Sequence, residues 1–197
     1  MNGRNAADEA QVAADPAKVV LWQAGEADLD TAAELFRGYL EFYEVEVEDP
    51  ERPRAFLAER LAGGDSLILL AEVPGAGTVG FAQVYPMISS LAMKPAWLLG
   101  DLYVAPAGRR TGAGRALLRE VLRRARSAGV SGVQLETAYD NLVAQGLYEA
   151  EGFVREEFHM YFHDLSQTGS QTGSETGSET GSGAGSGVGS AVVSESV

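Results

Sequence analysis

The sequence predicts an α/β protein in which a mixed sheet carries helices on both of its faces. Apolar residues recur at helical spacing in some stretches and alternate, as in a strand, in others. Read along residues 18–165, these stretches give the order β-α-α-β-β-β-α-β-α-β. Three strands in succession favour antiparallel neighbours, whereas the helix after them implies a crossover to a parallel strand.

The first half of this order is predicted to hold a strand, two helices and a hairpin. The first helix has its apolar residues at helical spacing, and Asp28 or Asp30 can cap its first turn. Prolines at the start and paired glycines at the end bound the second helix. The predicted elements are a strand over 18–24, a helix from Asp28 to about Tyr43, a helix from Pro50 and Pro53 to Gly63-Gly64, and strands over 66–73 and 78–85 joined by the turn PGAG.

The second half is predicted to alternate strands and helices. Its longest helix is amphipathic, with leucine and valine on the inner side and arginine on the outer side. The predicted elements are a loop over 86–95, a strand over 96–104, a helix over 112–128, a strand over 132–138, a helix over 141–151 and a final strand over 153–165.

Both ends of the chain have compositions typical of disorder. Residues 1–17 contain little that could be buried, and residues 166–197 repeat Gly, Ser and Thr every four positions. Such tracts lack the apolar bulk that offsets the entropy cost of ordering a backbone. We therefore expect one folded domain over 18–165, between two disordered extensions.

The charge balance excludes several classes of function. Fifteen basic against 28 acidic residues give a net charge of −13, which disfavours nucleic-acid binding. The absence of cysteine excludes disulfides and thiolate chemistry, and no apolar run reaches membrane-spanning length. A cytoplasmic protein is expected. Two lysines against thirteen arginines suit an acidic proteome in a salt-rich cytoplasm, as in a halophile, but a GC-rich genome produces the same bias.

A glycine-rich turn after the strand that ends at Val104 predicts an anion site. Gly112 and Gly114 let a ligand approach the backbone at the positive end of a helix, and Arg109 and Arg110 add charge. No Gly-Lys-Ser/Thr follows, which excludes a P-loop, and Leu117 stands where a dinucleotide fingerprint needs a small residue. A pyrophosphate loop of another kind and a plain helix start with turn glycines remain as alternatives.

A second motif decides between these alternatives through a family resemblance. Arg109-x-x-Gly112-x-Gly114, together with Asn141-x-x-Ala144-x-x-Leu147-Tyr148-Glu149-x-x-Gly152-Phe153, resembles the cofactor motifs of the GNAT superfamily of N-acetyltransferases. The resemblance covers essentially 18–165 and looks closest to the polyamine and small-amine branch. It implies the GNAT-type acyl-CoA N-acyltransferase fold and direct transfer of acetyl from acetyl-CoA to an amine in a ternary complex.

The resemblance also implies how acetyl-CoA is held. It places a bulge and a splay between strands 96–104 and 132–138, so that backbone groups at the end of strand 96–104 pair with the pantetheine arm. The implied cofactor-binding residues are Leu102, Tyr103 and Val104 for that arm, Arg109, Arg110, Thr111, Gly112, Ala113, Gly114 and Arg115 for the pyrophosphate, and Asn141 and Ala144 near the reacting end.

By the same resemblance Tyr148 is the general acid that protonates the leaving thiolate. The base stays open, because polyamine-type relatives carry a glutamate where this chain has Gly100. Strand alternation puts Leu99, Asp101 and Tyr103 on one face, so Asp101 cannot simply replace that glutamate. Four alternatives remain. Asp101 is either a catalytic residue or a structural acid, and the amine is otherwise deprotonated by a base acting through water or is used directly in its neutral form.

The acceptor is expected beside the first helical pair, where Tyr43, Glu44 and Tyr85 could receive a cationic amine. Its alternatives are a small-molecule primary amine and a peptide or protein amine, the N-terminus or a lysine. A non-catalytic CoA-binding module is the alternative outside enzymes. No metal is expected, since His159 and His163 would lie roughly 13 Å apart on a strand. No nucleic-acid or membrane partner is expected, and the resemblance allows a homodimer through the last strands.

Overall fold

The computed structural model describes residues 19–157, 159–163 and 165, and this part of the chain folds around one sheet. The strands lie in the order β1-β2-β3-β4-β5, antiparallel except for the parallel pair β4–β5. Their bounds are Val20–Gln23 (β1), Leu67–Val73 (β2), Gly77–Ser89 (β3), Lys94–Val104 (β4) and Val133–Gln134 (β5).

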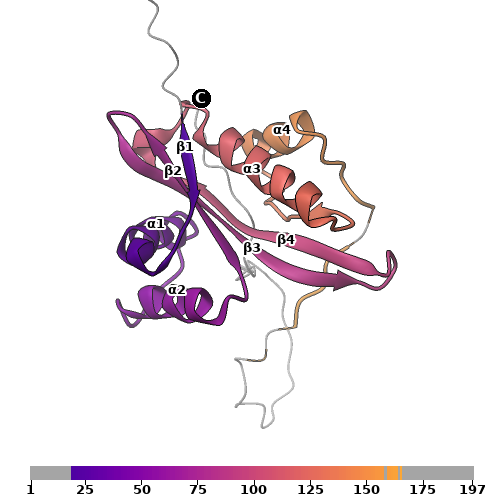
Figure 1. The fold of residues 1–197 in the computed structure, drawn as a ribbon, viewed down its shortest axis with the longest axis horizontal. Helices are drawn as coiled ribbons and strands as arrows, with labels where there is room; N and C mark the ends of the chain where they lie inside the picture. Colours follow the sequence, from indigo (N-terminus) through magenta and orange to yellow (C-terminus); the bar gives the residue numbers. More distant parts are fainter. Residues whose placement is uncertain (1–18, 158, 164, 166–197) are drawn as a thin grey trace, which may run out of the picture.

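Four α-helices cover the two faces of this sheet (Figure 1). Helices α1 and α2 lie on one face, and α3 and α4 on the other. Their bounds are Leu29–Phe42 (α1), Arg52–Gly63 (α2), Ala113–Ala128 (α3) and Leu142–Ala150 (α4). Short 3-10 turns precede α1 and α3, at Glu26–Asp28 and Pro106–Gly108. The mixed sheet with helices on both faces is therefore confirmed.

Strand alternation divides the interior into two cores. On β2, Leu69 belongs to the core beneath α3 and α4, whereas Leu70 belongs to the core beneath α1 and α2. Both leucines are fully buried because the sheet is covered on each side. Phe36 and Tyr39 of α1 stack in the second core, which places the aromatic face of α1 against β3 and β4.

The acidic residues expected to cap α1 make other contacts. The Asp28 carboxylate accepts hydrogen bonds from the Gly25 amide (2.8 Å) and from the indole of Trp22 (3.2 Å). Asp30 instead pairs with Arg54 of α2 at 2.7 Å. Asp28 is the N-cap residue of α1, as expected, but its carboxylate makes no hydrogen bond to the amides of the first turn, because it meets donors before the helix.

The segment predicted as a loop over 86–95 is the outer part of a long hairpin. β3 continues to Ser89 and β4 begins at Lys94, and Figure 1 shows this hairpin extending past the helices. Pro86 is tolerated in β3 because β2 ends its pairing at Leu67, so that β3 has β4 as its single neighbour there. The extension exposes Ile88, Leu91 and Met93.

Two strands are shorter than predicted. β5 occupies two residues of the expected 132–138, and the expected strand over 153–165 does not form among 153–157, 159–163 and 165. Met160, Tyr161 and Phe162 are consecutive apolar residues and all are exposed, so this segment lacks the alternation that one buried face requires. The predicted extensions over 1–17 and 166–197 lie outside the described residues. Among the residues that are described, no helix is long and apolar enough to cross a membrane.

Candidate active site

A β-bulge in β4 decides which side chains reach each face of the sheet. Gly100 is an extra residue between Leu99 and Asp101, which pair with neighbouring residues of β3. Leu99 therefore packs in the core under α3 and α4, whereas Asp101 contacts α1 and Tyr103 packs in the core beneath α1. The expectation that Leu99 shares a face with Asp101 and Tyr103 is wrong, because the bulge interrupts the alternation.

Beyond the bulge β4 has no neighbour on one edge within the described part of the chain. β5 pairs with Trp97 and Leu98 and then ends, so pairing stops before the last residues of β4. An unpaired edge offers backbone N–H and C=O groups to an extended ligand. This is the splay expected between strands 96–104 and 132–138, and the residues beside it are Leu102, Tyr103 and Val104.

The turn between β4 and α3 ends in backbone amides that lack an internal partner among the described residues. Arg110 and Gly112 have positive φ angles of 64° and 86°, and the Thr111 hydroxyl donates to the Gly108 carbonyl at 2.6 Å. The first helical bond of α3 is donated by Ala116. The three amides before it therefore have no hydrogen-bond partner among the described residues, as is usual in the first turn of a helix; they belong to Ala113, Gly114 and Arg115.

Arg109 adds a buried cationic donor to this turn. Its Nε is buried and has no hydrogen-bond partner among the described residues. A buried donor that stays unpaired costs free energy, about 1–3 kcal/mol, which an anionic ligand would recover. The amides and Arg109 together fit a phosphate-bearing ligand.

On the other side of the bulge, Asp101 lies at the centre of a tyrosine cluster. Its carboxylate is 6% exposed and accepts a hydrogen bond from the Tyr39 hydroxyl. Burial raises the pKa of Asp101 to about 6, although the bond from Tyr39 opposes the rise. Burial, and then the charge of Asp101, raise the pKa values of Tyr39, Tyr43 and Tyr85, so these phenols keep their protons at neutral pH.

Tyr85 occupies the space beside Gly100. A Cβ added to Gly100 would lie 2.7 Å from Cε2 of Tyr85, closer than real Cβ contacts come. The position where polyamine-type relatives are expected to carry glutamate is thus closed to any side chain unless Tyr85 moves. Asp101 is the carboxylate that remains at this part of β4.

Tyr148 of α4 approaches the same cluster from the opposite core. It is 3% exposed, and its ring lies 5.9 Å from that of Phe153. Burial raises the pKa of Tyr148, and the neighbouring Tyr43 adds to the rise. The effect of Tyr43 on this pKa is consistent with an approach of the predicted acid to the predicted acceptor side.

Three other predicted residues have different surroundings. Asn141 caps α4, since its Oδ1 accepts the Ala144 amide at 3.1 Å. Ala144 is fully buried in the core beneath α3, so its side chain is a packing residue. Glu44 is exposed on the turn after α1, with a φ of 56°, and no contact brings it to Asp101.

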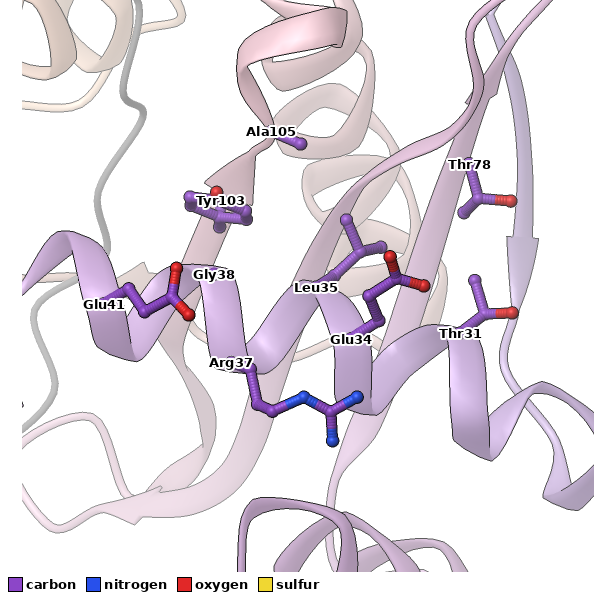
Figure 2. Close-up of a pocket in the computed structure, with 9 residues that line it drawn as sticks. All are labelled: Thr31, Glu34, Leu35, Arg37, Gly38, Glu41, Thr78, Tyr103 and Ala105. Atoms are coloured by element: carbon purple, nitrogen blue, oxygen red, sulfur yellow. The ribbon is translucent and has the colours of Figure 1, made fainter. Parts of the chain in front are cut away.

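A cavity of about 380 Å³ lies between α1 and the ends of β3 and β4 (Figure 2). Tyr103 reaches it because Gly38 has no side chain: a Cβ there would lie 2.7 Å from the Tyr103 hydroxyl. Asp101 does not border this cavity. Its lining residues are Thr31, Glu34, Leu35, Arg37, Gly38, Glu41, Thr78, Tyr103 and Ala105.

The comparison with known families agrees with this geometry. Residues 32–153 match the model of the Acetyltransferase (GNAT) family. The chain belongs to this family. It is 37% identical over 140 residues to the uncharacterized N-acetyltransferase YhfO of Bacillus subtilis, covering 71% of this chain and 93% of that protein.

A second relative and a solved structure extend the comparison of this GNAT protein. Aminoglycoside N(6′)-acetyltransferase type 1 of Stenotrophomonas maltophilia is 30% identical over 117 residues, covering 58% of this chain and 76% of that enzyme. The crystal structure of a probable acetyltransferase superposes with a TM-score of 0.68 at 38% identity, covering 74% of this chain and 97% of the other. The protein is an N-acetyltransferase with a mixed α/β GNAT fold, as the resemblance implied.

GNAT acetyltransferases use acetyl-CoA, and this chain has groups that fit it. The unpaired β4 edge suits the amides of a pantetheine arm, and the unpartnered Arg109 Nε with the first amides of α3 suits a pyrophosphate. No group of three or more metal-ligating side chains gathers among the described residues.

Gln83 is the site residue that sequence reasoning missed. Tyr39 belongs to the acidic and aromatic segment of the first helix on which the acceptor was expected, one helical turn before Tyr43. Gln83 is fully buried opposite Asp101 on β3, with its Nε2 donating to Ser66 at 2.9 Å. Nothing in the sequence alone pairs Gln83 with Asp101.

Proposed function

We propose that this enzyme acetylates a primary amine of a small molecule, with Asp101 receiving the proton of the amine and Tyr148 protonating the leaving sulfur. The observation that carries the proposal is the buried carboxylate of Asp101, which lies at the β4 bulge beside the unpaired strand edge. Asp101 affects the pKa of Tyr43, and Tyr43 affects the pKa of Tyr148. These interactions support an acid and a base that act at one reaction centre.

The charge of this region suits a cationic acceptor. Asp101 is ionised at neutral pH because its raised pKa, about 6, still lies below 7. Tyr39, Tyr43 and Tyr85 present aromatic rings around it, and such rings attract ammonium groups. An aminoglycoside acetyltransferase among the relatives supports acceptors with several amino groups.

The proton balance is closed by these residues. A free amine with a pKa near ~10.4 is charged at neutral pH and cannot attack until it loses a proton. Asp101 accepts that proton and releases it to solvent. When bound, acetyl-CoA supplies the acetyl thioester and the sulfur that takes up a proton. The C–S bond of the thioester breaks as the C–N bond forms.

Tyr148 holds the second proton in this scheme. Its raised pKa keeps the hydroxyl protonated at neutral pH, so Tyr148 is available as a donor when the C–S bond breaks. The phenolate then recovers a proton from the nitrogen that has formed the amide, through solvent. The sum is one proton released for each acetyl group transferred.

The remaining cofactor roles follow the same geometry. Leu102, Tyr103 and Val104 would pair with the pantetheine arm through their backbones, and the turn from Arg109 to Arg115 would bind the pyrophosphate. Asn141 would contribute its Nδ2 donor, since its Oδ1 is already used by Ala144. Ala144 contributes no side-chain contact.

The test is free-thiol release from acetyl-CoA with a panel of polyamines, amino acids, aminoglycosides and short peptides. It is run at low and at molar salt, because the acidic composition suggests a salt-rich medium. Turnover with one small-amine class, falling about 10²-fold in Tyr148→Phe, is the expected result. Turnover with peptides alone would show that the acceptor is a peptide amine and not a small molecule. CoA binding without thiol release at either salt would show that the chain is a CoA-binding module and not an enzyme.

A further inference from the structure

An ion cluster connects the first turn of α3 to the end of α4. Glu151, directly after α4, pairs with two arginines of α3: its Oε2 lies 2.8 Å from Nε of Arg119, and its Oε1 lies 3.4 Å from Nε of Arg115. The Glu151 side chain is 9% exposed, whereas the Arg115 side chain is 51% exposed. A nearly buried carboxylate is thus shared between two accessible cations.

The two contacts of Glu151 are unequal. The shorter contact is a hydrogen bond from Arg119, which lowers the pKa of Glu151 and keeps it ionised. The contact with Arg115 is longer and is not a hydrogen bond by its geometry. Arg119 therefore fixes the carboxylate, and Arg115 is the cation that can leave it at small cost.

Arg115 stands where a cation is otherwise disfavoured. It is the third residue of α3, and the positive end of the helix dipole opposes a guanidinium in the first turn. An anion beside Arg115 offsets this unfavourable interaction between the guanidinium and the helix dipole. Glu151 is that anion within the chain, and a diphosphate bound at the turn would be a second, because guanidinium groups bind phosphate oxygens in pairs.

Glu151 is also coupled to the end of α4. Its amide donates to the carbonyls of Leu147 and Tyr148, and the Phe153 amide donates to Tyr148 as well. The residue that holds Arg115 is therefore bonded to the backbone of the proposed general acid. A change at Arg115, which adjoins the turn between β4 and α3 that we call the phosphate turn, can be passed to α4 through the side chain of Glu151.

We propose that Glu151 is a positioning residue that competes with the diphosphate of acetyl-CoA for Arg115. In the free enzyme Glu151 holds the guanidinium at the edge of the turn. When the cofactor binds, Arg115 turns to the diphosphate and Glu151 stays with Arg119. The inference rests on the cofactor site proposed above, and it is independent of which amine is acetylated and of the role of Tyr148.

The test compares Glu151→Gln with Glu120→Gln as a matched control. Glu120 is also a carboxylate shared between two arginines, Arg123 at 2.7 Å and Arg124 at 2.8 Å, but this cluster lies within α3 and away from its first turn. The dissociation constant of CoA is measured by calorimetry without any amine, at low and at physiological ionic strength. The melting temperature of the free protein is measured beside it.

If Glu151 competes with the diphosphate, its removal should lower the stability of the free protein but raise its affinity for CoA. Glu151→Gln should melt lower than the native protein yet bind CoA about two- to fivefold more tightly, the range set by one exposed ion pair. Glu120→Gln should leave CoA binding unchanged. A merely structural role would weaken CoA binding together with stability, and that result, or an unchanged dissociation constant, would overturn the proposal.

A double-variant cycle assigns the effect to Arg115. Arg115→Gln should weaken CoA binding, and adding it to Glu151→Gln should abolish the tightening. Dephospho-CoA, which keeps the diphosphate and lacks the 3′-phosphate, should show the same tightening as CoA. Tightening that survives Arg115→Gln, or that disappears with dephospho-CoA, would contradict the competition for the diphosphate.

Discussion

Two candidate sites along β4 differ in construction. At its carboxyl end the turn into α3 is made of consecutive residues, and it offers backbone amides together with Arg109. At the bulge the site is made of side chains from different elements, with Tyr39 of α1 and Tyr85 of β3 beside the buried carboxylate of Asp101. Substitutions should therefore act on the first site through backbone conformation, and on the second through packing and charge.

The largest expected effect is on catalysis at the bulge. Asp101→Asn keeps the shape of the side chain and its acceptor for Tyr39, but it cannot take a proton. Its kcat/KM should fall on the order of 10²–10³-fold, while the dissociation constant of CoA stays unchanged. A steady-state assay beside CoA calorimetry checks this. Equal losses in both would show that the two sites are not separable.

The pH dependence of kcat/KM gives a second test of Asp101→Asn. Asp101 is protonated below its pKa of about 6 and cannot then accept a proton from the amine. The kcat/KM of the native enzyme should therefore rise with pH through about 6, and Asp101→Asn should lack this limb. A limb that persists in the variant would assign the titration to another group.

Stability should change in the opposite direction from activity. Burial raises the pKa of Asp101 from 3.8 to about 6, so folding favours its protonated form. That contribution is full below pH 3.8 and is lost as pH rises through 6, where ionised Asp101 costs about 3 kcal/mol. Asp101→Asn should then be more stable than the native protein at pH 8, with the advantage shrinking toward pH 4. Urea unfolding at both pH values tests this.

Packing beside the bulge gives a smaller effect. Gly100→Ala forces Tyr85 from its place, because the new Cβ would lie 2.7 Å from its ring. We expect a loss of about 1–3 kcal/mol in stability and a raised KM for the amine, with CoA binding preserved. Gly132→Ala, where a Cβ meets nothing within 4 Å, is the control. No shift in the amine KM would mean that Tyr85 does not border the acceptor.

Backbone strain at the phosphate turn gives the smallest effect. Gly112 has a φ of 86° with open space around it, so Gly112→Ala adds strain without a clash, about 1 kcal/mol. CoA should bind several-fold more weakly, while kcat at saturation is retained. Gly129→Ala carries similar strain at the other end of α3, with a φ of 67°, and should leave CoA binding intact. Equal effects of both variants on CoA would remove the distinction between the two sites.

The same division explains how much the sequence could predict. The phosphate turn could be recognised because the residues from Arg109 to Gly114 are contiguous and their spacing is local. The cluster at the bulge could be predicted only in part. The resemblance implied a bulge here and named Asp101, but the direction of Asp101 depends on the residue at which the register of β4 against β3 shifts, which the sequence does not give. Tyr39 joins Asp101 only after α1 docks on the sheet.

Element types were predicted better than element ends. The helices are close to their expected ranges because glycines and prolines mark their limits, as Pro53 and Gly64 do for α2. The hairpin was underestimated because Pro86 indicates a break where β3 has a single neighbour. The final strand was overestimated because aromatic content around Tyr161 was counted without a partner strand to pair with.

The close contact of Gly100 with Tyr85 also orders the routes by which this site can change. A carboxylate at position 100 has no room while the ring of Tyr85 is in place. A lineage, or a directed-evolution experiment, that moves toward such a carboxylate must first accept a smaller residue at position 85. The opposite order passes through an overcrowded intermediate, so the order of the two substitutions matters. The proposed catalytic arrangement is in this sense held in place by an aromatic ring that takes no part in the proposed proton transfers.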